Sequence, residues 1–269
     1  MTKTKINPVI KPVVETFQTV YYQTLMFAQN PESAINGLLV QGDAGTGKSH
    51  FVKQALRDAK VQSNVEYIKG GTITAAALYV KLYLNRASHR ITVLDDVDII
   101  GHPERTKIIP MILGASEEGR DRLVTWSTAK KNALMEEYDV PFEFEFNGNI
   151  IFITNYTKAD IKAKAKQWAA AFNSRFTPVE CIFNHEQKYM YTKHLVENVD
   201  MLGDKCLVHK WDGGNGYPQN VIDETVDFID DNYQNFSDIT PRVAVKIADT
   251  IYYNADPVMR RVMLNNLVK

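Results

Sequence analysis

The sequence predicts an α/β fold, in which a parallel β-sheet is covered by helices on both faces and is followed by a smaller helical domain. Short continuous apolar runs alternate with amphipathic segments through the first two thirds of the chain, a pattern typical of buried parallel strands and their connecting helices. From about residue 186 onward the strand-like runs stop and helical periodicity continues. We therefore expect one domain over residues 1–184 and a second over residues 185–269.

The individual elements follow from the period of the apolar residues. The predicted strands are the apolar runs 37–41, 65–68, 91–94, 150–153 and 179–183. The predicted helices cover about 8–30, 50–56, 72–86, 104–115 and 158–172, and then most of the chain from 186 on, apart from a Gly-rich loop at 211–218. Thr74 is the predicted cap of the 72–86 helix. Residues 122–126 and 142–146 alternate between apolar and polar side chains, which predicts two strands of an inserted hairpin.

The composition is that of an ordinary globular protein. The chain has 269 residues, 45% hydrophobic and 23% charged, with a formal net charge of −1, so the whole chain lacks a basic balance that would favour nucleic acid. No run reaches the roughly 18 apolar residues of a membrane span, and we expect no membrane partner. Cys181 and Cys206 show neither metal-ligand spacing nor a disulfide framework, which favours reduced thiols and a cytoplasmic location.

Residues 42–49 read GDAGTGKS, the complete Walker A pattern G-x-x-x-x-G-K-[ST], between a predicted strand and a predicted helix. Its glycines let the backbone turn tightly and direct N–H groups at the phosphates of ATP. Lys48 supplies a charge for the β- and γ-phosphates, and the Ser49 hydroxyl is a ligand for Mg²⁺. The predicted nucleotide-binding residues are Gly42, Asp43, Ala44, Gly45, Thr46, Gly47, Lys48 and Ser49.

Polar side chains at the ends of two predicted strands complete this site. Residues 91–96 read ITVLDD, a Walker B candidate that delivers carboxylates to the carboxyl end of a strand. We expect Asp95 to hold Mg²⁺ and Asp96 to orient or deprotonate the attacking water. Asn155 follows the 150–153 run, where its amide can contact the γ-phosphate or align the water; an asparagine that merely starts a turn is the alternative.

These segments together resemble the AAA+ ATPases, a family of P-loop NTPases, over nearly the whole chain. GDAGTGKS, ITVLDD, IIFITN, AAFNSRF and ITPRVAVKIAD resemble, in the family's order, Walker A, Walker B, sensor 1, the arginine finger and sensor 2. The resemblance implies that Asn155 is sensor 1, that Arg175 reaches the γ-phosphate of a neighbouring subunit, and that Arg242 closes a helical lid on the nucleotide.

The resemblance also implies ATP and Mg²⁺ as cofactors and a homo-oligomer, a ring or spiral with a hexamer favoured. Structural alternatives remain for both arginines: Arg175 as a cation at a helix C-terminus, and Arg242 as a surface ion-pair residue at a helix start. One residue departs from the family pattern, since Asp96 stands where the family usually has glutamate. The shorter side chain leaves slow hydrolysis open, and with it an ATP-gated assembly scaffold.

The inserted hairpin is the clue to what the oligomer acts on. It resembles insertions near the pore of AAA+ helicase and initiator relatives, and it carries Lys130 and Lys131; acidic neighbours weaken this interpretation, and solvated surface lysines are the alternative. The segment 69–74 lacks the aromatic residue that protein-unfolding relatives place there. We expect an ATP hydrolase that acts on DNA or a DNA-bound protein, as small helicase loaders do, in the cytoplasm or in a host's cytoplasm if virus-encoded. A protein-remodelling chaperone is the other alternative.

Overall fold

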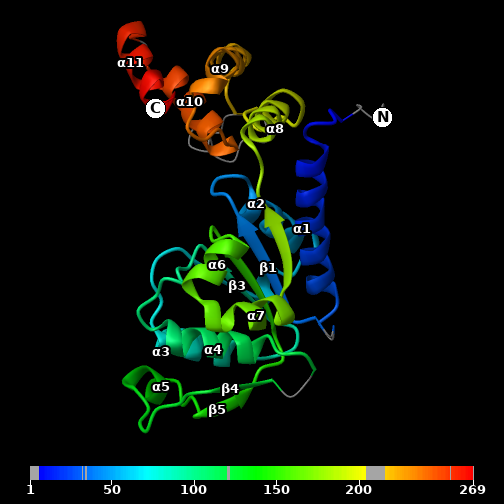
Figure 1. Ribbon diagram of the computed structural model, residues 1–269, viewed down its shortest axis with the longest axis vertical. Coiled ribbons are helices and arrows are strands. Elements are labelled where there is room, and N and C mark those ends of the chain that lie inside the picture. Colours follow the sequence, from blue (N-terminus) through cyan, green and yellow to red (C-terminus); the bar gives the residue numbers. More distant parts are fainter. Residues whose placement is uncertain are drawn as a thin grey trace. The chain divides into compact units, whose positions relative to one another are not determined.

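The computed structural model in Figure 1 describes residues 6–31, 33, 35–119, 122–203, 216–254 and 256–268. It divides into two compact units, and each is described by itself. The sheet unit consists of Thr16–Ala44 and Lys48–Ile182, and the helical unit of the described residues within Met1–Glu15, Gly45–Gly47 and Phe183–Lys269. The predicted division into domains 1–184 and 185–269 stays a prediction.

A five-stranded parallel sheet forms the centre of the sheet unit, in the order β2-β3-β6-β1-β7, which confirms the predicted fold class. Its strands are β1 (Gly37–Gly42), β2 (Val65–Lys69), β3 (Ile91–Asp95), β6 (Asn149–Thr154) and β7 (Thr177–Cys181). Strands β1, β3 and β6 are buried along their whole length, which explains their continuous apolar sequences. Because β6 lies between β1 and β3 and all three strands are parallel, the segments that follow them lie close together at the carboxyl ends of the strands.

Helices cover both faces of this sheet (Figure 1). Those of the sheet unit are α1 (Lys11–Gln29, which begins in the helical unit), α2 (Lys48–Asp58), α3 (Ala75–Leu84), α4 (Arg105–Ala115), α6 (Lys158–Lys164) and α7 (Lys166–Arg175), with a short 3₁₀ turn η1 (Gln62–Asn64). Leu39, Leu94 and Phe152 share one face and join a core with α3, α4 and α7. On the other face α2 contacts β3, and α1 packs on α2 by stacking Phe17 on Phe51 at 4.8 Å.

The predicted single helix over 158–172 is wrong, because two helices, α6 and α7, occupy this segment. They are separated at Ala165, whose φ of −133° and ψ of 41° interrupt the helix. A capping box of Thr157 and Asp160 begins α6. The sequence contains neither Gly nor Pro between residues 158 and 172, so no local signal marks the break. Tertiary packing decides it: Ala165 and Phe172 are both buried in the core, at 2% and 1% exposure.

The last strand of the sheet lies two residues earlier than the predicted 179–183. β7 pairs with β1 from Leu38 opposite Thr177 to Gly42 opposite Cys181, so the length of β1 sets its bounds. Ile182 lies beyond this pairing and is exposed. Pro178 fits in β7 because β7 is the edge strand, where a missing N–H on the outer side costs no ladder bond. The apolar run alone could not show which of its residues pair.

The predicted hairpin is confirmed as β4 (Leu123–Thr125) and β5 (Glu143–Glu145), antiparallel, with a short helix α5 (Ala133–Glu137) between them. It packs on α3 through Tyr79, whose ring centroid lies 5.4 Å from that of Trp126 and 5.0 Å from that of Phe144. At its base, the buried Arg122 guanidinium donates to the carbonyls of Ala115 (3.0 Å) and Gly148 (2.8 Å). Burial lowers the pKa of Arg122 to about 10. These contacts fix the hairpin on the body of the sheet unit.

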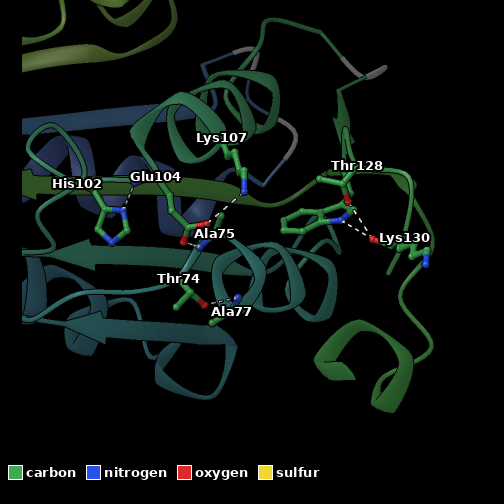
Figure 2. A network of polar contacts seen from close by, with 9 residues as sticks. Thr74, Ala75, Ala77, His102, Glu104, Lys107, Thr128 and Lys130 are labelled. Atoms are coloured by element: carbon green, nitrogen blue, oxygen red, sulfur yellow. Dashed lines mark hydrogen bonds and ion pairs between the residues drawn. The ribbon is translucent and has the colours of Figure 1, made fainter. Parts of the chain in front are cut away.

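The amino terminus of α3 is capped from two directions (Figure 2). Thr74 is its N-cap, as predicted, and accepts a hydrogen bond from the Ala77 N–H at 3.2 Å. The Glu104 carboxylate, from the start of α4, accepts a second from the Ala75 N–H at 3.0 Å, and Lys107 contacts the same carboxylate at 3.4 Å. The hydrogen bond from Ala75 is the main reason that the pKa of Glu104 is lowered. Glu104 therefore ties α3 to α4 in its ionised form.

We expect Glu104→Ala to lower the free energy of unfolding by about 0.5–1 kcal/mol at pH 7, since α3 loses an N-terminal acceptor. Because the folded-state pKa lies below the ordinary value of 4.5, this stabilisation is present above pH 4.5 and is lost as the pH falls through the folded-state value. Urea unfolding followed by circular dichroism at pH 7 and at low pH measures both effects. Glu118→Ala, which removes an exposed carboxylate, is the control. An equal difference between Glu104→Ala and the parent protein at both pH values would contradict the assignment.

The helical unit contains α8 (His185–Asn198), α9 (Gln219–Asn232), the 3₁₀ turn η2 (Tyr233–Asn235), α10 (Pro241–Tyr253) and α11 (Pro257–Val268), which confirms the predicted helical C-terminal part. Ile229, Ile239 and Ile247 are among the residues of its own apolar core. Lys193 and the Tyr189 hydroxyl both bind Asp230, which joins α8 to α9. Residues 211–215 of the predicted loop lie outside the described residues, as does Cys206. Every described helix is too short or too polar to cross a membrane.

Candidate nucleotide-binding site

The Walker A segment forms a tight loop between β1 and α2. Gly42, Gly45 and Gly47 have φ values of 128°, 74° and 116°, in the region that favours glycine. A side chain at Gly42 would place its Cβ 2.3 Å from the Cys181 carbonyl oxygen, and that same oxygen accepts a hydrogen bond from the Asp43 N–H at 3.0 Å. The start of the loop is thus fixed against the end of β7. Glycine is therefore required at position 42 because any side chain there would clash with the backbone of Cys181 in β7.

Lys48 occupies the inside of this loop. Its Nζ donates to the carbonyl oxygens of Gly42 (2.9 Å) and Asp43 (2.6 Å) and to Oδ1 of Asn155 (3.0 Å). The side chain is buried, and burial is the largest influence on its pKa, which is lowered; the nearby carboxylates Asp96, Asp43 and Asp95 oppose that shift. Three acceptors therefore hold the Lys48 ammonium group at the Walker A loop, which is the predicted phosphate-binding segment.

Ser49 and Asp95 meet on the face of the sheet that α2 covers. The Ser49 hydroxyl donates to Asp95 Oδ1 at 2.6 Å, and the Tyr67 hydroxyl donates to Asp95 Oδ2 at 2.6 Å. Asp95 is 3% exposed. A hydroxyl and a carboxylate at one point suit Mg²⁺, which is usually bound by one or two protein oxygens together with water and substrate phosphates. The residues present therefore fit the predicted metal, and Ser49 and Asp95 are the side chains that would hold it.

Asn155 joins the Walker A lysine to the second carboxylate. Its Oδ1 accepts from Lys48, and its Nδ2 donates to Asp96 Oδ1. Asp96 has a φ of 61°, a left-handed conformation that aspartate tolerates better than most residues, and its N–H donates to the Ile153 carbonyl at 3.0 Å. The strained turn directs the Asp96 carboxylate across the end of β6 to Asn155. The sequence predicted each residue, and the structure brings the three side chains into one chain of hydrogen bonds.

A cavity of about 320 Å³ lies beside this chain of hydrogen bonds. It is lined by Asp96, Val97, Asp98, Thr154, Asn155 and Tyr156. Asp98 Oδ1 already accepts from the Tyr156 hydroxyl (3.0 Å) and the Gly101 N–H (2.8 Å), so this carboxylate has a structural role. Of the two carboxylates on the cavity wall, Asp96 is therefore the better candidate for aligning a water molecule.

Within the sheet unit, the structure does not bring Arg175 to these site residues. Arg175 ends α7, just before Thr177 pairs with Leu38 at the amino end of β1, whereas the Walker A loop leaves the carboxyl end of β1. At that opposite end of the sheet Arg175 donates to Glu117 at 3.0 Å. Arg242 is an exposed residue in the first turn of α10, in the helical unit. The roles that the resemblance implies for both residues stay predictions.

Tyr67 also contacts the site through Asp95, and it is not among the predicted site residues. Burial and then its hydrogen bond to Asp95 raise the pKa of Tyr67, so the phenol keeps its proton and acts as a donor. Its ring also lies 4.6 Å from Lys53 Nζ, on α2. No local motif marks this tyrosine, and only the pairing of β2 with β3 brings it to Asp95. The hairpin lysines lie outside the site: Lys131 pairs with Asp139 at 3.9 Å, and Lys130 is exposed.

Comparisons with known proteins agree with this architecture. The fold matches that of a RuvB mutant from Thermotoga maritima with a TM-score of 0.50 and 12% sequence identity, over 94% of this chain and 69% of that one. Domain III of the replication initiation protein DnaA from the same organism aligns over 99% of this chain and 100% of its own, with 12% identity and a TM-score of 0.47. The chain thus shares the fold of that RuvB structure, a parallel sheet with flanking helices followed by C-terminal helices, as the resemblance to AAA+ ATPases predicts.

One curated sequence is also similar. It is an uncharacterized 36.7 kDa protein of the nrdC–mobD intergenic region of Enterobacteria phage T4, 35% identical over 122 residues. The alignment covers 45% of this chain and 36% of that relative, so the chain spans about a third of the relative's length. No protein-family model matches the chain. These comparisons show the fold and a phage relative, but they do not show an activity.

Proposed function

We propose that the protein binds ATP with Mg²⁺ and hydrolyses it as part of a homo-oligomer, and that this oligomer acts on DNA or on a DNA-bound protein. The observation that carries the proposal is the convergence of Lys48, Asn155 and Asp96 at the loop where Ser49 meets Asp95. A positioned cation, a metal-ligand pair and a polar group beside a cavity are the parts that phosphoryl transfer to water requires.

Each residue then has one role. The loop N–H groups and Lys48 bind the phosphates, and Ser49 and Asp95 hold the metal ion. When bound, Mg²⁺ supplies positive charge to the phosphate oxygens. Asp96, directed by its left-handed backbone, orients the attacking water and accepts its proton, and Asn155 keeps Asp96 and Lys48 aligned. Arg175 supplies a further positive charge to the nucleotide of a neighbouring subunit, and Arg242 closes the helical lid on the nucleotide.

The oligomer part of the proposal is supported by the position of Arg175. Within its own chain this arginine lies at the opposite end of the sheet from the Walker A loop, so it can serve a nucleotide only in another subunit. A ring or spiral, with a hexamer favoured, supplies such a neighbour to every site. The DNA-directed part rests on the resemblance of the β4–β5 hairpin, with Lys130 and Lys131, to insertions of AAA+ helicase and initiator relatives.

The test is ATP turnover by the purified protein across a concentration series, with and without single-stranded DNA. We expect the rate per subunit to rise with protein concentration and to rise again with DNA, because assembly completes each site and the substrate stimulates the motor. A flat rate without a DNA effect would replace the DNA-directed proposal by a protein-remodelling ATPase. ATP binding without turnover at any concentration would leave an ATP-gated scaffold, consistent with the shorter Asp96 side chain.

A further inference from the structure

Tyr67 of β2 lies one strand away from the carboxylate that is proposed to hold Mg²⁺. In the β2–β3 pairing Tyr67 stands opposite Val93, and Lys69 stands opposite Asp95. Side chains two residues apart on a strand share a face, so the Tyr67 and Asp95 side chains lie diagonally next to each other on the same face. A tyrosine is long enough to span that diagonal, and its hydroxyl reaches Asp95 Oδ2 at 2.6 Å.

Helix α2 covers the same pair of side chains from above the sheet. Ser49 and Lys53 are four residues apart and therefore lie on one face of α2. Ser49 donates to Asp95 Oδ1 at 2.6 Å, and Lys53 Nζ lies 4.6 Å from the centre of the Tyr67 ring. Lys53 thus contacts the ring of Tyr67, and Asp95 accepts a hydrogen bond from its hydroxyl. Tyr67 is half-buried, which limits the alternatives open to its hydroxyl.

The two oxygens of Asp95 consequently have different partners. Oδ2 is taken by the phenol of Tyr67, while Oδ1 points to the hydroxyl of Ser49. A carboxylate with one oxygen fixed in this way cannot rotate about its terminal bond without losing a hydrogen bond in a site where it is 3% exposed. Its other oxygen is therefore presented to the position beside Ser49, where the metal ion is expected.

We propose that Tyr67 is a positioning residue that orients the Asp95 carboxylate for Mg²⁺ and so sets the affinity of the site for the metal–nucleotide complex. This inference rests on the proposed nucleotide function, since it concerns the same site. Groups that hydrogen-bond to metal ligands from outside orient them, and their loss typically weakens metal binding about 10- to 100-fold. Tyr67 acts through Asp95 and does not touch the phosphates.

The experiment is titration of Mg²⁺ into the protein with a fluorescent ATP analogue, for the parent protein and for Tyr67→Phe, which removes only the hydroxyl. We expect the Mg²⁺ concentration at half-saturation to rise about 10- to 100-fold in Tyr67→Phe. The affinity for the analogue in EDTA should not change, and this value also shows that the variant is folded. Equal half-saturation in the two proteins would overturn the role of Tyr67.

Two further variants separate positioning from a general structural effect. Tyr21→Phe is the matched control, because Tyr21 also donates its hydroxyl to an aspartate, Asp58, at 2.9 Å, but at the far end of α2; its Mg²⁺ titration should match that of the parent. In an Asp95→Asn background, Tyr67→Phe should add less than a twofold change, since the two residues act through one contact. A full additional loss there would overturn the inference.

The failure of this inference differs from the failure of the proposed function. If the parent protein binds the analogue and responds to Mg²⁺, but Tyr67→Phe responds equally, only the role of Tyr67 is wrong. If the parent protein does not bind the analogue, or binds it without any effect of Mg²⁺, the proposed function is wrong and this inference with it.

Discussion

Lys48→Ala is expected to reduce ATP binding and turnover by about 10²-fold or more, because it removes the positioned charge at the phosphates. The lysine is buried and its ammonium contacts Gly42, Asp43 and Asn155, so the substitution removes one cation and releases three acceptors. No other lysine is placed to replace it in the part of the site that the structure describes, since Lys53 lies against the Tyr67 ring. Binding of a fluorescent ATP analogue and steady-state phosphate release measure the two effects.

The control for this prediction is Lys166→Ala, which removes the same charge from an exposed position on α7. It should bind and hydrolyse ATP as the parent protein does. Circular dichroism must show that Lys48→Ala is folded, since the buried carbonyls that it leaves without their donor cost stability. Turnover at the parent rate in a folded Lys48→Ala protein would refute the Walker A assignment.

Arg175→Ala is expected to retain ATP binding and to lose turnover by about 10³- to 10⁵-fold at concentrations where the protein is assembled. This is the factor that an arginine finger contributes to the rate of phosphoryl transfer. The expectation follows from the place of Arg175, at the opposite end of the sheet from its own Walker A loop. Turnover and analogue binding are measured in parallel above the assembly concentration. Undiminished turnover in the assembled protein would refute the finger role.

The structure supplies a control that separates the finger from a structural role. Arg175 pairs with Glu117 at 3.0 Å, so Glu117→Gln removes the ion pair and leaves the arginine in place. If Arg175 serves only to hold α7 near Glu117, the Glu117→Gln variant should lose as much turnover as Arg175→Ala. If Arg175 is an arginine finger, the Glu117→Gln variant should lose little turnover. Mixing Arg175→Ala with Lys48→Ala subunits should restore part of the activity, because an intact Walker A loop then meets an intact arginine across an interface.

Local sequence patterns predicted the parts of the fold whose causes are local. The strands β1, β3 and β6 were found because burial on both faces requires continuous apolar runs, and the Thr74 cap because its side chain bonds the next turn of the same helix. The break at Ala165 was missed because nothing in residues 158–172 marks it, and packing in the core produces it. The shift of β7 was missed because its register depends on β1.

The candidate site divides in the same way. The sequence by itself determined the Walker A loop, since three glycines, a lysine and a serine at fixed spacing shape and charge one continuous segment of backbone. Only the tertiary structure decided which distant side chains meet it: Asn155 bonds Lys48 across 107 positions, and Asp95 bonds Ser49 across 46. Tyr67 joins them because β2 pairs with β3. Strand order, which depends on long-range packing and on no local pattern, places these residues together.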